Sequence, residues 1–172
     1  FSFEYPLAPE ASFPQILKDL MTGIGNARAY FETYDGDESC IYMTGTRAGA
    51  SLCVYLAAML GSPELAEAFE IVPAKLYIRA LGLVSGMYYT TKLDSIGIFL
   101  PSYIYGKQWK KSSFYPYIDP ENEAIIRHLP PSFLVTAYGD MLRNYSRQYA
   151  EAMKRGGAIC HLEDFEAGKK LP

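Results

Sequence analysis

Apolar and polar residues alternate along the chain in two different periods. Short apolar runs bounded by Gly, Pro or Asp predict strands, at residues 1–5, 41–44, 79–85, 132–137 and 158–165. Apolar residues repeated at helical spacing predict the helices between them, at residues 15–34, 50–60, 63–69, 121–128 and 140–155. This alternation has the spacing of βαβ units. It therefore predicts an α/β fold, a mostly parallel sheet with helices on both faces.

One segment interrupts this regular pattern. Residues 86–122 are rich in Tyr and Pro, with helical pieces expected near 93–99. Long irregular insertions more often form functional loops or lids than idle connections. We therefore expect residues 1–172 to form a single domain with a cap-like insertion at about 86–122. The tyrosines there are equally consistent with an aromatic-lined pocket and with ordinary core packing.

Composition excludes several classes of function. Hydrophobic residues make up 49% of the chain and charged residues 20%, which is typical of a globular protein. The net charge of -3 argues against nucleic-acid binding, because phosphate recognition needs a basic face. The longest apolar run, residues 52–60, is about half the ~20 residues that a membrane span requires. No basic-then-apolar leader is present, so we expect no secretory signal.

The cysteines indicate a reducing compartment. Cys40, Cys53 and Cys160 are odd in number and lie in apolar stretches, which favours buried free thiols and a cytoplasmic protein. No Cys/His spacing resembles a metal site, so we expect neither a metal nor another cofactor.

The most informative stretch is the turn between the strand at 41–44 and the apolar helix that follows. Gly45 and Gly49 flank it, with Thr46, Arg47 and Ala48 between them. A strand running through such a turn into a helix is the layout of a nucleophile elbow, in which a strained turn presents the central side chain at the top of the sheet. A serine hydrolase has Ser at that centre, whereas this chain has Arg47. Ser51 lies about one turn inside the helix and is not presented by the elbow.

Five stretches, in order along the chain, are similar to known motifs: residues 5–10 to a YRLAPE loop, 13–19 to an FP-x-x-L-x-D helix start, 45–49 to GDSAG, 129–136 to an LPP strand and 139–143 to a D-x-L-R-D segment. Together they resemble the hormone-sensitive-lipase-like branch of the α/β-hydrolase family. Two positions depart from its motifs: Pro6 stands where Arg is usual, and Asn144 replaces a second acid.

The resemblance implies roles for individual residues. Asp140 takes the place of the triad acid, although it could equally be a plain helix N-cap, or both. The backbone N–H of Ala48 would form half of the oxyanion hole. The family's histidine would lie at or just past Pro172. His161, within the last strand, and His128, at a helix end, are expected to be structural.

The resemblance also implies that part of the fold is missing. The chain does not begin with Met and opens inside an apolar run, which indicates a fragment or a trimmed chain. The N-terminal strands and the C-terminal histidine loop and helix would then be absent. In this family the strand of the oxyanion loop lies between the segment ending at Tyr5 and the elbow strand. We therefore expect further chain, a second chain, or a rearranged sheet to fill that slot.

Two functions remain open from the sequence. By resemblance, the protein is an esterase or lipase-like hydrolase of small carboxylic esters, and Arg47 leaves this chain without a nucleophile. Alternatively, it is a non-catalytic pseudoenzyme that binds a small ligand, with Arg47 pairing with Asp140 or with a bound carboxylate or phosphate. Arg47 could be an engineered or erroneous change, a natural loss, or an elbow repurposed to bind an anion. A nucleotide-binding fold is disfavoured because the turn is glycine-poor. A homo-oligomer stays open.

Overall fold

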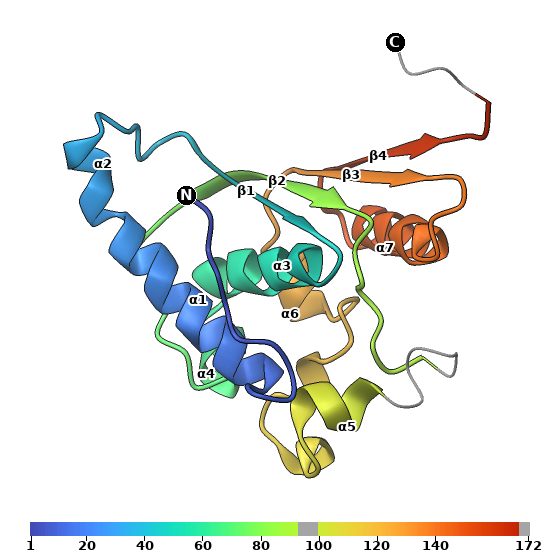
Figure 1. Ribbon diagram of the computed structural model, residues 1–172, viewed down its shortest axis with the longest axis horizontal. Coiled ribbons are helices and arrows are strands. Elements are labelled where there is room, and N and C mark those ends of the chain that lie inside the picture. Colours follow the sequence, from blue (N-terminus) through green and yellow to red (C-terminus); the bar gives the residue numbers. More distant parts are fainter. Residues whose placement is uncertain (93–99, 169–172) are drawn as a thin grey trace.

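The computed structural model describes residues 1–92 and 100–168 (Figure 1). The helical pieces expected near 93–99 lie outside these residues. The strands are β1 (Ile41–Thr46), β2 (Ile78–Val84), β3 (Ser132–Ala137) and β4 (Cys160–Phe165). The helices are α1 (Phe13–Ala27), α2 (Ala29–Thr33), α3 (Ala48–Gly61), α4 (Pro63–Ala68), α5 (Leu100–Tyr105), α6 (Glu123–Ile126) and α7 (Arg143–Arg155), with short 3₁₀ turns η1 (Trp109–Lys111) and η2 (Tyr115–Tyr117).

The four strands form one parallel sheet in the order β1-β2-β3-β4, which confirms the predicted fold class. Helices α3 and α7 pack beneath the sheet in Figure 1, on the same face. Right-handed crossovers between strands whose spatial order follows the chain order put their helices on one side. Among the described residues, helices therefore cover one face of the sheet, whereas the sequence predicted cover on both.

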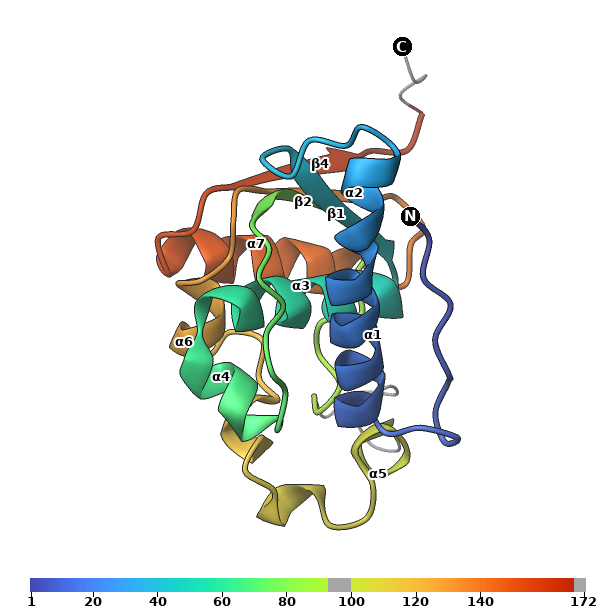
Figure 2. The same cartoon turned by 90° about the vertical axis from the view of Figure 1, so that its left-hand side faces the viewer.

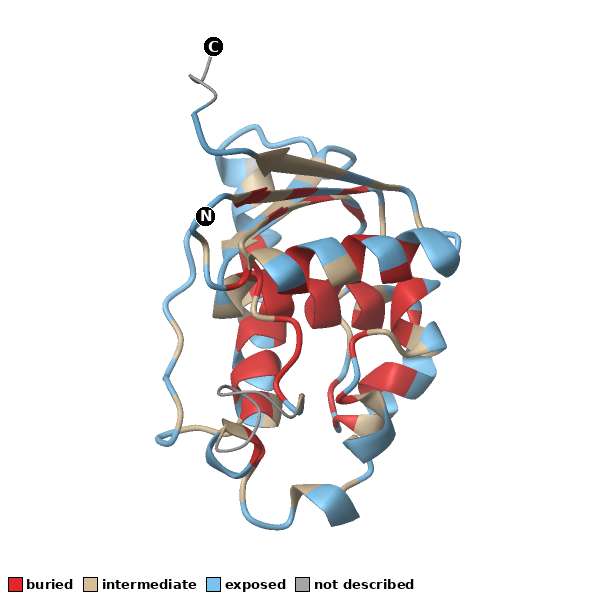
Figure 3. Cartoon of the chain, turned by 90° about the vertical axis from the view of Figure 1, so that its right-hand side faces the viewer, coloured by how far each residue is buried: buried red, intermediate tan, exposed pale blue. Residues whose placement is uncertain are grey.

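Helix α3 is the centre of the core. It is apolar all round, and its residues from Ala50 to Met59 are all buried. A helix without a polar face is stable only when it is surrounded. The sheet lies above α3, and α1, α4 and α6 pack against its other sides (Figure 2). The opposite face of the sheet, which we call the outer face, is not covered by any of the described helices (Figure 3). Tyr42 and Phe133 lie on this face and are 66% and 46% exposed.

The predicted strand at residues 1–5 is wrong. This segment runs past β1 as irregular chain and makes no backbone hydrogen bond to the described residues. A strand needs a hydrogen-bonded neighbour, and no described strand pairs with this segment. A cavity of about 350 Å³ separates it from β1, lined among others by Phe3, Tyr5 and Thr44. The sheet has therefore not rearranged to close the slot beside β1.

The structure differs from two further predictions, on the helix at 15–34 and on the burial of Cys40. The helix predicted at 15–34 divides into α1 and α2 at Arg28, while Gly23 and Gly25 lie inside α1. The buried face of α1 keeps the helix continuous past both glycines, because packing outweighs their low helix propensity. Cys40 is exposed rather than buried, since it precedes β1 in a surface turn, whereas Cys53 is buried and Cys160 is partly buried.

Two buried tyrosines give opposite expectations for loss of a hydroxyl. The Tyr149 hydroxyl is buried and has no hydrogen-bond partner among the described residues. The Tyr55 hydroxyl contacts the carbonyl oxygens of Tyr117 and Ile118, at 2.8 and 2.9 Å. We expect Tyr149→Phe to raise the free energy of unfolding by about 1 kcal/mol and Tyr55→Phe to lower it by about 1–2 kcal/mol. Urea denaturation of both variants checks this, and a similar loss in both would contradict it.

Candidate active site

The turn between β1 and α3 has the geometry expected of a nucleophile elbow. Arg47, at its centre, has φ 56° and ψ -119°, a conformation that non-glycine residues rarely adopt. The turn is nevertheless tightly held. The N–H of Arg47 donates to the carbonyl of Val84 at 3.0 Å, and the Arg47 carbonyl accepts from the N–H groups of Ala50 and Met87. The backbone therefore presents the side chain of residue 47 whatever that side chain is.

Gly45 allows this turn to be so tight. A Cβ atom on Gly45 would lie 2.4 Å from the backbone carbonyl carbon and oxygen of Gly49, closer than real atoms approach. Strand β1 and the first turn of α3 therefore meet at a point where only a hydrogen atom fits. Gly49 is different, since a Cβ there would find Tyr5 Oη no nearer than 4.0 Å.

The elbow side chain reaches the expected acid. Arg47 Nη1 donates to Asp140 Oδ1 at 2.5 Å, so two residues 93 positions apart in sequence form an ion pair. The guanidinium is half exposed, whereas the Asp140 side chain is only 7% exposed. The pairing of Arg47 with Asp140, one of the alternatives in the sequence analysis, is the one observed here.

Asp140 lies in the loop that follows β3, and its carboxylate is also held from other sides. Oδ1 accepts the Leu142 N–H at 3.0 Å, and Thr136 Oγ1 lies 3.4 Å from Oδ2. Helix α7 begins at Arg143, with Leu142 in the N-cap position. The plain N-cap role for Asp140 is therefore wrong, because its carboxylate binds an N–H that precedes the helix.

These contacts set the protonation of Asp140. Burial by itself would raise the pKa of this carboxyl group. The hydrogen bonds from the Ser85 side chain and the Leu142 N–H outweigh burial, and the Arg47 guanidinium adds to them. The pKa of Asp140 therefore lies below its ordinary value of 3.8, and the group is a carboxylate at neutral pH.

A second set of charges fixes the start of α7, directly after Asp140. Arg143 Nε donates to Asp164 Oδ1 at 2.7 Å, and Arg143 Nη2 donates to Glu166 Oε1 at 2.6 Å. Arg147 contacts the other oxygen of Asp164 at 2.5 Å. Because Arg143 and Asp164 are both largely buried, this network ties α7 to the end of β4 and so limits the movement of the acid loop.

Sequence reasoning missed Ser85, which lies at the carboxyl end of β2 beside the elbow. Its φ is 48°, and nothing in the residue types predicts a left-handed Ser at that point. One signal could have identified Ser85 as a candidate: it follows a buried apolar run and precedes Gly86. Polar residues at the carboxyl ends of parallel strands gather at one edge of the sheet, where sites form.

The other polar candidates lie elsewhere. Ser51 is buried in α3 and donates to the Met87 carbonyl at 2.5 Å. His161 lies near the start of β4, stacked on Phe133 on the outer face. His128 Nδ1 lies 2.9 Å from the carbonyl oxygen of Ala124, at the end of α6. These contacts are with neighbours on a strand and on a helix, and the position expected for the family's histidine lies outside the described residues.

Ala48 is the first residue of α3. The first N–H groups of a helix have no intrahelical carbonyl to bind, so the Ala48 N–H can be directed at an anion.

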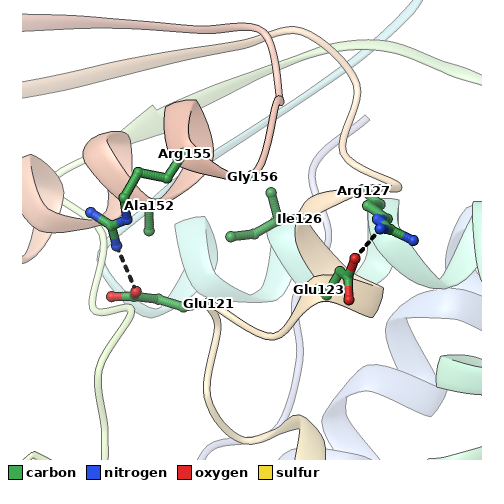
Figure 4. Close-up of a pocket in the computed structure, with 7 residues that line it drawn as sticks. All are labelled: Glu121, Glu123, Ile126, Arg127, Ala152, Arg155 and Gly156. Carbon is green, nitrogen blue, oxygen red and sulfur yellow. Dashed lines mark hydrogen bonds and ion pairs between the residues drawn. The ribbon is translucent and has the colours of Figure 1, made fainter.

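A cavity of about 390 Å³ lies away from the elbow, between α6 and α7. Figure 4 shows two ion pairs at its sides, Arg155 with Glu121 and Arg127 with Glu123. Glu121 also accepts hydrogen bonds from the Tyr89 hydroxyl and the Gln148 amide. The charged side chains that line this cavity therefore pair with one another.

Within residues 1–92 and 100–168, no helix combines the length and the apolar character needed to cross a bilayer.

Comparison with known proteins agrees with this geometry. The family described as alpha/beta hydrolase fold matches residues 1–169. The carboxylesterase NlhH of Mycobacterium tuberculosis (strain H37Rv) is 27% identical over 173 residues, which cover 95% of this chain and 53% of that protein. The chain therefore spans about half the length of this relative.

Solved structures show the same fold. Esterase B from Lactobacillus rhamnosis (HN001) matches with a TM-score of 0.82 at 17% identity, over 96% of this chain and 54% of that chain. An esterase from Pyrobaculum calidifontis gives a TM-score of 0.67 at 22% identity, over 95% of this chain and 55% of that chain. At such identities the likeness concerns the fold alone.

The two elbow glycines give a matched test of the turn. We expect Gly45→Ala to lower the free energy of unfolding by about 3 kcal/mol, because its Cβ would overlap the Gly49 backbone. Gly49→Ala should instead raise the free energy of unfolding by about 0.5 kcal/mol, since Ala favours a helix and has room. Urea denaturation distinguishes them. Equal stability of the two variants would contradict the proposed close approach.

Asp140 should make the stability of the fold depend on pH. Because its pKa is lower in the folded than in the unfolded chain, its contribution is present above about 3.8 and is lost as pH falls through the folded value. We expect the difference in unfolding free energy between the native chain and Asp140→Asn to shrink below pH 3.8. Urea titrations across this range measure it, and a difference that stays constant on acidification would refute the stabilised carboxylate.

Proposed function

We propose, because this chain belongs to the α/β-hydrolase fold family, that it is part of an esterase-like hydrolase of small carboxylic esters whose nucleophile position Arg47 occupies. The observation that carries the proposal is the strained elbow, whose central side chain reaches a buried carboxylate on the loop after β3. A backbone outlier of this kind persists where the surrounding structure enforces it, and such outliers cluster at active sites.

The geometry supports a serine-type reaction at position 47. In an intact relative, a Ser hydroxyl here would attack the ester carbonyl carbon and pass its proton to an imidazole that Asp140 orients. The oxyanion of the tetrahedral intermediate would face the Ala48 N–H. The alcohol would leave with that proton, and water would then release the acid. Arg47 cannot begin this sequence, because its guanidinium stays charged and is neither nucleophile nor base.

The irregular segment at 86–122 supports a cap-like role beside this site. It starts against the elbow, where the Met87 N–H donates to the Arg47 carbonyl and the Met87 carbonyl accepts from Ser51. The segment then packs through Tyr105 and Phe114 against Phe69 and Phe13. We propose that the described parts of this segment, residues 86–92 and 100–122, help to shape the acyl-binding side of the site around residue 47.

A second function is favoured by the exposure of Arg47. One of its nitrogen atoms binds Asp140, and the side chain is 53% exposed. A guanidinium carries five N–H donors, so the remaining ones can bind a carboxylate or phosphate. We propose a non-catalytic small-anion-binding protein as the alternative. The free cysteines support a reducing compartment for either function, and we propose the cytoplasm.

The test is hydrolysis of a short-chain p-nitrophenyl ester by the full-length protein, including the segment that would carry the family's histidine, with Arg47 and with Arg47→Ser. We expect no turnover with Arg47, and with Arg47→Ser a rate about 10³-fold or more above background, since a complete triad exceeds its remnants by that much. Adding Asp140→Asn to Arg47→Ser should cost about 10⁴-fold, because the imidazole loses its orienting carboxylate.

The contrary outcome points to the alternative. If both forms are folded and neither hydrolyses the ester, titration with acetate and with inorganic phosphate tests the anion-binding function. Binding that Arg47→Met abolishes would then establish it.

A further inference from the structure

The irregular segment at 86–122 contacts α7 at both of its ends. Near its start, Tyr89 is buried, and its ring packs edge-on against Tyr145 of α7 with the two ring centroids 5.2 Å apart. At its end, the Glu121 carboxylate binds Arg155, in the last turn of α7 (Figure 4). Tyr89 and Glu121, which are 32 residues apart in sequence, therefore meet on the same helix.

Glu121 is the residue on which these contacts converge. Its Oε1 accepts hydrogen bonds from the Tyr89 hydroxyl at 2.7 Å and from the Gln148 side-chain amide at 2.8 Å. Its Oε2 accepts from Arg155 Nη2 at 3.0 Å. Burial by itself would raise the pKa of Glu121, but these hydrogen bonds and the charge of Arg155 lower it below its ordinary value. The group is therefore a carboxylate whose donors come both from the start of the segment and from α7.

Lys92 brings the opposite charge into the same cluster. Its Nζ donates to the side-chain oxygen of Gln148, while the amide nitrogen of Gln148 donates to Glu121. The same Nζ lies 3.8 Å from the ring centroid of Tyr89 and 4.9 Å from that of Tyr145. Gln148 thus bridges an ammonium group and a carboxylate, and both ends of its amide are used in doing so.

We propose that a polar clamp holds both ends of the irregular segment on α7 and so limits local opening of the segment beside the elbow. The clamp consists of Tyr89, Lys92, Glu121, Gln148 and Arg155. It acts close to the elbow because Met87, near the start of the segment, donates its N–H to the Arg47 carbonyl at 3.1 Å. The clamp does not involve the side chain at position 47, so it acts alike in a hydrolase and in an anion-binding protein.

Hydrogen exchange of single amides measures local opening in the native, full-length protein with Arg47 in place. Met87 and Asn122 are the reporters, because their N–H groups are hydrogen-bonded, to the carbonyls of Arg47 and Asp119. We expect Glu121→Ala to speed exchange of both amides by about tenfold or more, since hydrogen bonds to a charged group are lost. Amides of α3, which lies in the core, should accelerate less. Tyr89→Phe removes one donor only and should act in the same direction to a smaller extent.

Glu123→Ala is the matched control. Glu123 also pairs with an arginine, but its partner is Arg127, four residues on in the sequence and at the end of the same helix, α6 (Figure 4). This ion pair spans a single helical turn, and so its loss should leave the exchange of the Met87 amide unchanged.

Two results would overturn the proposal. If the Met87 amide exchanges equally fast in the native chain, in Tyr89→Phe and in Glu121→Ala, aromatic packing alone holds the segment. If the amides of Met87 and of α3 accelerate by the same factor, Glu121 supports the fold as a whole and not the segment. Both results are obtained with Arg47 in place, so they hold whether or not Arg47→Ser hydrolyses the ester.

Discussion

The contact between β1 and α3 at Gly45 is the constraint on which the rest of this structure depends. The strand and the helix approach so closely that Gly45 can carry no Cβ. That approach forces the chain through the strained conformation at Arg47 and directs α3 back beneath the sheet. Since α3 is buried on every side, it in turn fixes the helices that surround it. The packing of the core and the shape of the site thus have the same origin.

Asp140 depends on the same arrangement. A largely buried carboxylate is unfavourable unless charges or hydrogen-bond donors compensate it. Here the donors come from the elbow after β1, from β3 and from the loop before α7. Arg47 supplies the opposite charge directly from the elbow, so the carboxylate is neutralised without a histidine among the described residues. An ion pair of this kind offers neither a nucleophile nor an imidazole that could carry a proton.

Much of this fold could be predicted from residue pattern, and the limits have physical causes. Both boundaries of strand β3 were predicted correctly, because Pro130 and Pro131 precede a mostly apolar run. The segment at 1–5 has a similar composition but forms no strand, because pairing depends on a neighbour that local sequence does not encode. Arg47 and Asp140 were found from motif positions. Ser85 was not, because its left-handed backbone forms where the chain is held against β3, a contact that local sequence does not encode.

The elbow also separates folding from chemistry. Its conformation is maintained by Gly45 and by backbone hydrogen bonds to Val84, Ala50 and Met87, none of which involves the side chain at position 47. That side chain is half exposed, so packing in the core does not determine which residue stands at position 47. A change of residue 47 can therefore alter the chemistry of the site while the turn that presents this residue is kept, and its effect on stability is confined to the ion pair with Asp140.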